Sequence, residues 1–326
     1  MANAENAKIQ IEGGQQQQPM SALSNSGDNT VFESGSELWS RRSGYEPVVR
    51  PDGLITGGAI TPAQGGTPNA VDVAALTAYV GGAQVAAAAE TGLTCARPIT
   101  DTHLVYSIVV DEAGAITAES GTEGTSFSET RGSAGGPPLI PVGSIEVGQV
   151  RLNSQSSAAV KASEVFQVVG VHQERYDFPI FEIDYRNGSV VFNSALPTIH
   201  TGDEPKGVSA SYAEPIFTDL ARATDFVPSE TSHSLSSTQI YGGTIGSSSS
   251  TLNQASFTAF LNDGITDGLI KLKNEILWFK FFQNRFQSNY ILEQGKLGIS
   301  RTFPAGDDIQ AACTISPEEA GVEVTA

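Results

Sequence analysis

Residues 276–282 read Ile-Leu-Trp-Phe-Lys-Phe-Phe, and all but one of these side chains are apolar. In an extended strand, successive side chains point to opposite faces. Leu277, Phe279 and Phe281 therefore share one face, while Trp278 and Phe282 lie on the other. A strand with one face in water alternates apolar and polar residues, so two apolar faces predict burial on both sides. We expect one face to pack in a β core and the other to be covered by the chain itself or by another subunit.

The segments around this run predict further strands and one short helix. Before it, residues 253–261 place four apolar side chains on one face, which predicts a half-buried strand with Ala255, Phe257, Ala259 and Leu261 turned inward. Residues 263–273 then fit a short helix, with Asn262 or Asp263 as its N-cap. Its apolar stripe would consist of Ile265, Leu269, Ile270 and Leu272. Residues 290–302 and 309–316 complete a β meander.

Upstream segments are also β-like, and their sequence pattern changes near residue 159. Between 44 and 158, glycine and proline pairs separate three strand candidates, 71–80, 102–111 and 144–152. The first would place Val71, Val73, Ala75, Thr77 and Tyr79 on one face, and a helix over 71–89 is the alternative. Beyond 159, strands are predicted at 165–173, 181–185, 189–192 and 208–212. Asn187-Gly188 lies between two of them and is a strong hairpin signal.

These patterns predict three regions. Residues 1–43 are polar and form an extended N-terminal arm, ending in Trp39 beside two arginines, which is typical of a docked segment. Residues 44–158 form an additional β-rich domain. Residues 159–326 form a second β domain, with its helix near 263–273.

The composition excludes several functional classes. The net charge of −18 and the absence of a Lys/Arg cluster argue against a protein that grips nucleic-acid phosphates. The only cysteines, Cys95 and Cys313, lie far apart, and we expect both to be partly buried, reduced thiols. The N-terminus has no apolar run typical of a signal peptide, and no segment is long enough to span a bilayer. We expect the chain to be made in the cytoplasm and kept there until it assembles.

No catalytic or metal-binding motif is present. The sequence lacks a nucleophile elbow, a P-loop and a His-Glu-x-x-His motif. Its four histidines stand alone, without the spacing of a zinc site. Carboxylates are frequent, so an acid–base pair of the glycosidase kind stays open on sequence alone. We expect no enzyme activity, no cofactor and no metal.

The C-terminal segment resembles the major tail tube proteins of long-tailed bacteriophages. The similarity starts in the run Thr251-Leu-Asn-Gln-Ala-Ser-Phe-Thr-Ala-Phe-Leu261 and continues through the helix at 263–273 and the strand at 276–282. A hairpin through Gln287-Ser288-Asn289 follows, and then the segment Ser300-Arg-Thr-Phe-Pro304 and a last strand at 309–316. The order of elements carries this resemblance over about the last 75 residues, and it is weaker over 44–158.

The resemblance implies a β-sandwich or half-barrel with one flanking helix, to which this chain adds an N-terminal β domain. In that family six subunits form a ring, the inner sheets join into one barrel, and stacked rings enclose a lumen that conducts DNA. An acidic lumen would repel passing phosphates. Partners would be further copies of the chain, the tail-tip and terminator proteins, and the tape measure protein in the lumen. The location would be the virion tail, without membrane insertion by this chain.

Aromatic side chains near the doubly apolar strand are the candidates for subunit contacts: Trp278, Phe282, Phe286, Tyr290 and, in the arm, Trp39. Two alternatives stay open. One is another virion protein, such as a tail-tip, tail-completion or decoration protein, which copy number per particle would distinguish. The other is an adhesive or carbohydrate-binding β module, which needs an exposed aromatic platform on residues 44–158 and would be favoured by glycan-array binding of that segment alone.

Overall fold

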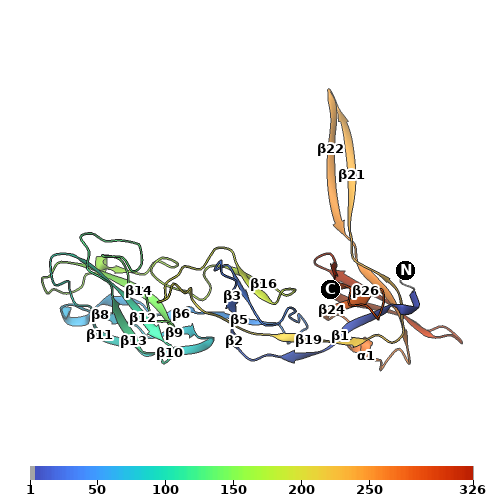
Figure 1. Cartoon of the computed structure of the whole chain (residues 1–326), viewed down its shortest axis with the longest axis horizontal. Coiled ribbons are helices and arrows are strands. Elements are labelled where there is room, and N and C mark those ends of the chain that lie inside the picture. Colours follow the sequence, from blue (N-terminus) through green and yellow to red (C-terminus); the bar gives the residue numbers. More distant parts are fainter. Residues whose placement is uncertain (1–3, 326) are drawn as a thin grey trace. The chain divides into compact units, whose positions relative to one another are not determined.

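The computed structural model describes residues 4–325, except for the side chain of Thr244. The chain is mainly β, as expected, and its strands pair in antiparallel ladders (Figure 1). Among the described residues the single α-helix is α1 (Gly268–Lys271), and no helix is long and apolar enough to cross a membrane. The chain divides into two compact units. The first comprises residues 4–18, 38–47 and 212–325, and the second comprises residues 19–37 and 48–211.

One eight-stranded sheet forms most of the first unit. Its order is β19 (Ala213–Asp219), β1 (Lys8–Gln17), β24 (Ile276–Phe282), β25 (Tyr290–Thr302), β26 (Ile309–Pro317), β23 (Ala255–Leu261) and β20 (Ala223–Val227), with β27 (Val322–Val324) also paired to β25. The unit also contains the 3-10 turn η1 (Ala4–Asn6) and a separate hairpin of β21 (Thr231–Ile240) and β22 (Gly243–Leu252).

The eight-stranded sheet is strongly curled. β19 and β20 stand at opposite ends of the strand order, yet only Leu220, Ala221 and Arg222 separate them in the chain. The concave side encloses a core of apolar side chains from β1, β23, β24, β25 and β26. Its members include Ile11, Phe257, Leu277 and Phe279. The expected inward face of β23 is confirmed, because burial alternates along the whole strand.

The second unit is built from five small sheets. Three of them have the strand orders β10 (Ala83–Ala87), β9 (Leu76–Val80), β6 (Gly53–Gly57); β11 (Glu90–Thr94), β8 (Ala70–Val73), β7 (Ile60–Pro62); and β2 (Ser21–Ala22), β18 (Val208–Ser211), β5 (Val48–Pro51). The other two have four strands each. Their orders are β13 (Ile116–Ser120), β12 (His103–Asp111), β14 (Ser144–Asn153), β15 (Val165–Phe166), and β16 (Phe181–Asp184), β17 (Ser189–Phe192), β4 (Val31–Glu33), β3 (Ser24–Asn25). Two 3-10 turns, η2 (Gln64–Gly66) and η3 (Ala162–Glu164), complete the unit.

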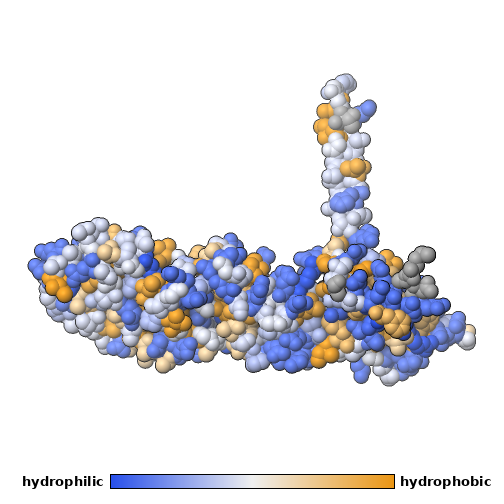
Figure 2. Space-filling model, in the orientation of Figure 1, coloured by the Kyte–Doolittle hydropathy of each residue, from blue (hydrophilic) through white to orange (hydrophobic). Residues whose placement is uncertain are grey.

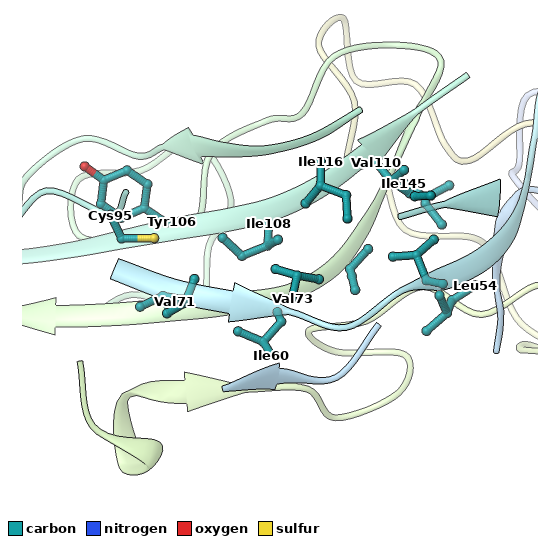
Figure 3. Packing of buried hydrophobic residues seen from close by; sticks show 14 of the residues in the cluster. Leu54, Ile60, Val71, Val73, Cys95, Tyr106, Ile108, Val110, Ile116 and Ile145 are labelled. Carbon is teal, nitrogen blue, oxygen red and sulfur yellow. The ribbon is translucent and has the colours of Figure 1, made fainter. Parts of the chain in front are cut away.

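A single apolar cluster joins three of these sheets (Figure 3). Ile108 and Val110 of β12 and Ile145 of β14 meet Val71 and Val73 of β8, and all five side chains are fully buried or nearly so. The buried thiol of Cys95 lies in the same cluster. Burial raises the pKa of both Cys95 and Cys313 to about 12, which keeps these free thiols protonated and unreactive.

The domain boundaries differ from those expected. Residues 8–17 of the supposed arm form β1, which is hydrogen-bonded between β19 and β24 in the first unit. Residues 160–211 belong to the second unit rather than to the C-terminal β domain. Residues 1–3 of the arm lie outside the described residues. Local sequence patterns failed here because both differences depend on pairing between strands that are far apart in the chain.

Several local expectations were also wrong. The segment 71–80 is strand, as expected, but its predicted single face is wrong, because the strand breaks at Ala74-Ala75 and the buried side chains then become Leu76, Ala78 and Val80. The strand expected over 165–173 ends after Phe166. The helix spans only Gly268–Lys271 with Asp267 as its N-cap, because Asp263 instead accepts hydrogen bonds from the backbone N–H groups of Ile265 and Thr266.

Candidate assembly surfaces

The hairpin β21–β22 has no core of its own. Its ten residue pairs run without a shift from Thr231–Leu252 to Ile240–Gly243, and every residue of β21 is exposed. Hydroxyl groups bridge the strands, with Oγ–Oγ distances of 2.6 Å for both Ser234–Ser249 and Ser236–Ser247. A two-stranded hairpin without such a core is marginally stable in water. The hairpin therefore has the properties of an element that a partner completes.

Apolar side chains lie on the outer part of this hairpin. Leu235 is 86% exposed and Tyr241 at the turn is fully exposed, while Ile240 and Ile245 are more than half exposed. Figure 2 shows separate hydrophobic patches on the hairpin, whose remaining surface is neutral to hydrophilic. Burying one such side chain contributes about 1.5–3 kcal/mol. This stabilisation is not realised in the single chain and is available for association.

The curled sheet has two edges that no strand covers. Residues 216–219 of β19 pair only with β1, and β20 pairs only with β23. In the part of the chain that the structure describes, no strand pairs with the outer edge of either. Pro215 also lies in β19, and proline is tolerated in edge strands because it cannot donate to a ladder. Unpaired edges present backbone N–H and C=O groups that can add another strand. The edges and the hairpin belong to the same unit.

Two of the expected interface residues are internal. Trp39 and Trp278 are 0% and 1% exposed, and the indole N–H of Trp278 donates to the Trp39 carbonyl at 2.8 Å. The Trp39 ring stacks on Tyr212, with 4.8 Å between ring centroids. Thus the chain itself covers the second face of β24 at Trp278, and the expectation of a subunit contact is corrected for both tryptophans.

A buried carboxylate fixes this internal contact. Glu12 is fully buried, accepts a hydrogen bond from Ser40 Oγ, and accepts the backbone N–H of Trp278 at 3.1 Å. Burial raises the pKa of Glu12, although the hydrogen bonds from Ser40 and Trp278 oppose this rise. The segment 38–42 is therefore docked against β1 and β24, as expected for a segment that ends in a tryptophan and two arginines.

The other three aromatic candidates lie nearer the surface. Phe282 and Tyr290 are half-buried and contact each other at 5.2 Å between centroids, and the Lys8 ammonium lies 4.5 Å from the Phe282 centroid. Phe286 is 79% exposed and lines an open groove of about 960 Å³ in the first unit, together with Phe226, Phe281, and Leu220 and Ala221 between β19 and β20. Of the five candidates, Phe286 presents the most accessible ring for a subunit contact.

The sequence patterns did not predict the hairpin. Residues 231–252 have hydroxyl side chains on both faces, so the alternation that marks a half-buried strand is absent. The Gly242-Gly243 pair after Tyr241 was the available signal, since Gly242 adopts a φ of 94° at the turn.

Neither a search for metal-binding clusters nor a comparison with known proteins assigns a function to the chain. Within residues 4–325, no group of three or more His, Cys, Asp or Glu side chains is placed to hold a metal ion. No family model matches the chain, and no curated protein or solved structure is significantly similar to it.

Proposed function

We propose that the chain is a structural subunit of a bacteriophage tail tube, which assembles as stacked hexameric rings around a lumen that conducts DNA. The single observation that carries the proposal furthest is the coreless hairpin β21–β22 on a curled sheet with open edges. Such a unit gains most of its unused stabilisation by associating with copies of itself. The resemblance of residues 251–316 to tail tube proteins supports this assignment.

The two open edges suit a ring. An interface between unlike surfaces of identical subunits closes into a ring when the rotation between them closes. In our proposal the β20 edge of one subunit approaches the β19 edge of the next, and six sheets form one barrel. This arrangement would satisfy edge groups that otherwise promote aggregation. The hairpin would then contact a neighbouring copy through Leu235 and its tip.

The net charge agrees with a conduit for DNA. At −18 the chain would repel phosphates rather than hold them, so DNA would pass without adhering. In this role the partners would be tail-tip and terminator proteins at the tube ends and a tape measure protein in the lumen. The protein would be located in the virion tail.

Negative-stain microscopy of the purified full-length protein tests the proposal. We expect rings with six-fold symmetry or tubes at high protein concentration. A chain that stays monomeric at every concentration, and is missing from the tube of assembled particles, would refute the assignment. A head-bound location at low copy number would instead favour a decoration protein.

Deletion of the hairpin β21–β22 tests whether this element is needed for assembly. The backbone N–H of Asn253 donates to the Glu230 carbonyl at 3.0 Å, so the two ends of the hairpin are adjacent. Replacing residues 231–252 by Gly-Gly should leave the core of the first unit intact and abolish assembly. Tubes that form as readily without the hairpin would show that it has no part in assembly.

A further inference from the structure

A cavity of about 600 Å³ opens in the second unit. Its walls are β14, the loop that contains Glu129 and Arg131, the loop 170–179, the loop 194–199 and Lys206. This volume lies within the range of about 300–1,000 Å³ that is typical of small-molecule sites. All of these residues belong to one compact unit, so the cavity is defined within it.

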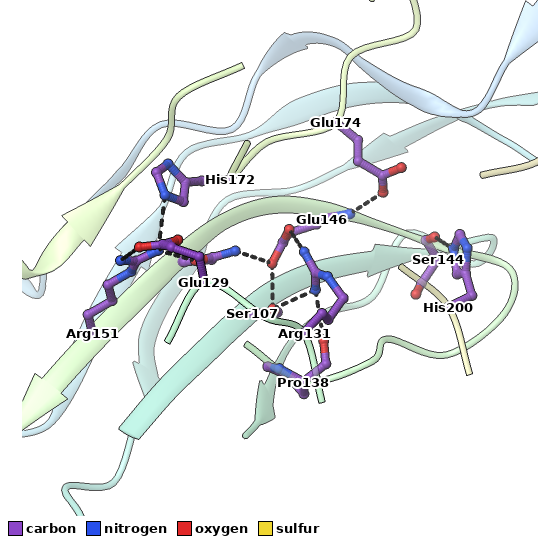
Figure 4. A network of polar contacts seen from close by, with 11 residues as sticks. Ser107, Glu129, Arg131, Pro138, Ser144, Glu146, Arg151, His172, Glu174 and His200 are labelled. Atoms are coloured by element: carbon purple, nitrogen blue, oxygen red, sulfur yellow. Dashed lines mark hydrogen bonds and ion pairs between the residues drawn. The ribbon is translucent and has the colours of Figure 1, made fainter. Parts of the chain in front are cut away.

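The floor of the cavity is a fixed polar network (Figure 4). The buried Glu146 carboxylate accepts hydrogen bonds from Arg131, Ser107 and Gln149. Beside it, Arg151 binds Glu129 with two hydrogen bonds of 2.6 and 2.7 Å. Because these side chains hold one another, a ligand would meet them in place, and little ordering cost would oppose binding.

The charges that line the cavity balance. Glu129 and Glu146 are matched by Arg131 and Arg175 in the lining, and burial favours the neutral forms of the remaining pair because it raises the pKa of Glu174 to about 8 and lowers that of Lys206. Burial and the neighbouring Arg151 guanidinium lower the pKa of His172, so its ring is neutral at pH 7. The lining therefore has no excess of either sign to select a charged ligand, and its polar groups suit a neutral molecule with many hydrogen-bonding groups.

Two buried polar atoms of the lining have no partner. Arg151 Nη2 donates to His172 Nε2 at 3.1 Å, so His172 Nδ1 carries the proton and is an unused donor. Glu174 Oε2 accepts the Glu146 backbone N–H at 2.8 Å, while Oε1 is unpaired. Buried polar atoms without partners are rare in native proteins.

An exposed aromatic ring stands at the rim. Phe178 lines the cavity and is 46% exposed. Its ring packs on Gly170, where a Cβ would lie 2.2 Å from Phe178 Cε1, and Gly170 has a φ of 77°. Only glycine therefore allows this close approach of the ring to the loop. An exposed ring beside polar groups matches a molecule with one C–H face and a rim of hydroxyls.

We propose that this cavity binds a neutral saccharide, with its C–H face on Phe178 and its hydroxyls directed to the polar floor. This activity goes beyond assembly, since it concerns a different unit of the chain. It would give each subunit a weak glycan-binding site, and a structure with many copies would multiply such weak contacts.

The test uses the full-length protein on a printed array of glucose, galactose, rhamnose and N-acetylglucosamine oligosaccharides, with sialylated and uronate glycans as the acidic set. The strongest neutral glycan is then titrated by calorimetry. Phe178→Ala should raise the dissociation constant by about tenfold or more, and Phe178→Tyr should retain binding. Phe127→Ala is the matched control, because Phe127 is also partly exposed in this unit but does not line the cavity.

Three results would overturn the proposal: no neutral glycan binds, only acidic glycans bind, or Phe178→Ala binds as well as the wild type. If Phe178→Ala fails to fold, Phe178→Leu keeps apolar volume without a planar ring and should show the same loss. The Phe178 variants are expected to assemble into hexameric rings as the wild type does. Loss of glycan binding is therefore distinguishable from failure of the tail tube assignment.

Discussion

Replacement of Leu235 by serine isolates the contribution of the hairpin to assembly. Leu235 is 86% exposed in the single chain, so nearly all of its burial must come from a partner. Burying a leucine side chain contributes about 1.5–3 kcal/mol. Each 1.4 kcal/mol changes an equilibrium constant tenfold, so Leu235→Ser should raise the critical concentration for tube formation roughly 10- to 150-fold.

The matched control is Ile99→Ser. Ile99 is 87% exposed and lies in the second unit, so the same loss of apolar surface occurs at a site that the assembly proposal does not use. Neither substitution should change the free energy of unfolding of the monomer by more than about 0.5 kcal/mol, because both side chains are already in water.

The assay is sedimentation of assembled material across a concentration series, with negative-stain images of each pellet. The proposal requires a large shift for Leu235→Ser and none for Ile99→Ser. Equal critical concentrations for wild type and Leu235→Ser would refute the role of the hairpin. An equal shift for both variants would show general loss of apolar surface rather than a specific contact.

Three further predictions concern the folded chain. Trp39→Ala should lower the free energy of unfolding by about 3–5 kcal/mol in a urea titration, because the buried ring stacks on Tyr212, whereas Phe286→Ala should change it by less than about 0.5 kcal/mol. Burial raises the pKa of Asp52 to about 7 and that of Glu174 to about 8. The contribution of these two groups to the free energy of unfolding should therefore be greatest below about pH 4 and fall as pH rises toward 8. Between pH 5 and pH 8, urea titrations should show a smaller fall in this free energy for Asp52→Asn than for the wild type. Glu146→Gln should cost about 3–5 kcal/mol in the same titration, because it leaves the Arg131 guanidinium without its buried carboxylate, and an unchanged midpoint would contradict the network.

The pH prediction depends on the direction of each shift. In the unfolded chain Asp52 and Glu174 titrate near their ordinary values of 3.8 and 4.5, whereas the folded chain keeps both protonated to higher pH. The folded state therefore binds more protons between about pH 4 and 8, and its stability declines across that window. Burial lowers the pKa of Lys206, so this residue acts in the opposite sense at alkaline pH.

The sequence predicted those elements whose pattern reports burial inside the chain. β23 alternates Ala255, Phe257, Ala259 and Leu261 toward the core, and β24 and β25 begin and end where expected. The hairpin of β16 and β17 also forms around the Asn187-Gly188 signal, with Gly188 at a φ of 56°. In these cases the side chains themselves carry the information, because each strand has a partner nearby in the chain.

Long-range pairing was beyond the same patterns. β1 contributes Ile9 and Ile11 to the core of the first unit, yet it ends in Gly-Gly and a run of glutamines. Its identity as a strand depends on β19 and β24, which lie more than 190 residues away. Likewise, the polar floor of the cavity joins β12, β14 and two loops, and no local motif connects Glu146 to Arg131 or His172.

The hairpin β21–β22 was missed for a different reason, and that reason bears on function. A pattern of burial can predict only elements that the chain itself buries. Ser232, Ser234 and Ser236 alternate with His233 and Leu235, so neither face of β21 is apolar enough to require a core. A strand pair of this length without its own core is marginally stable in water, and under the assembly proposal a neighbouring copy stabilises it through Leu235 and the tip. Hence the failure of the sequence pattern and the proposal of assembly have a common physical origin, and the Leu235→Ser measurement tests both.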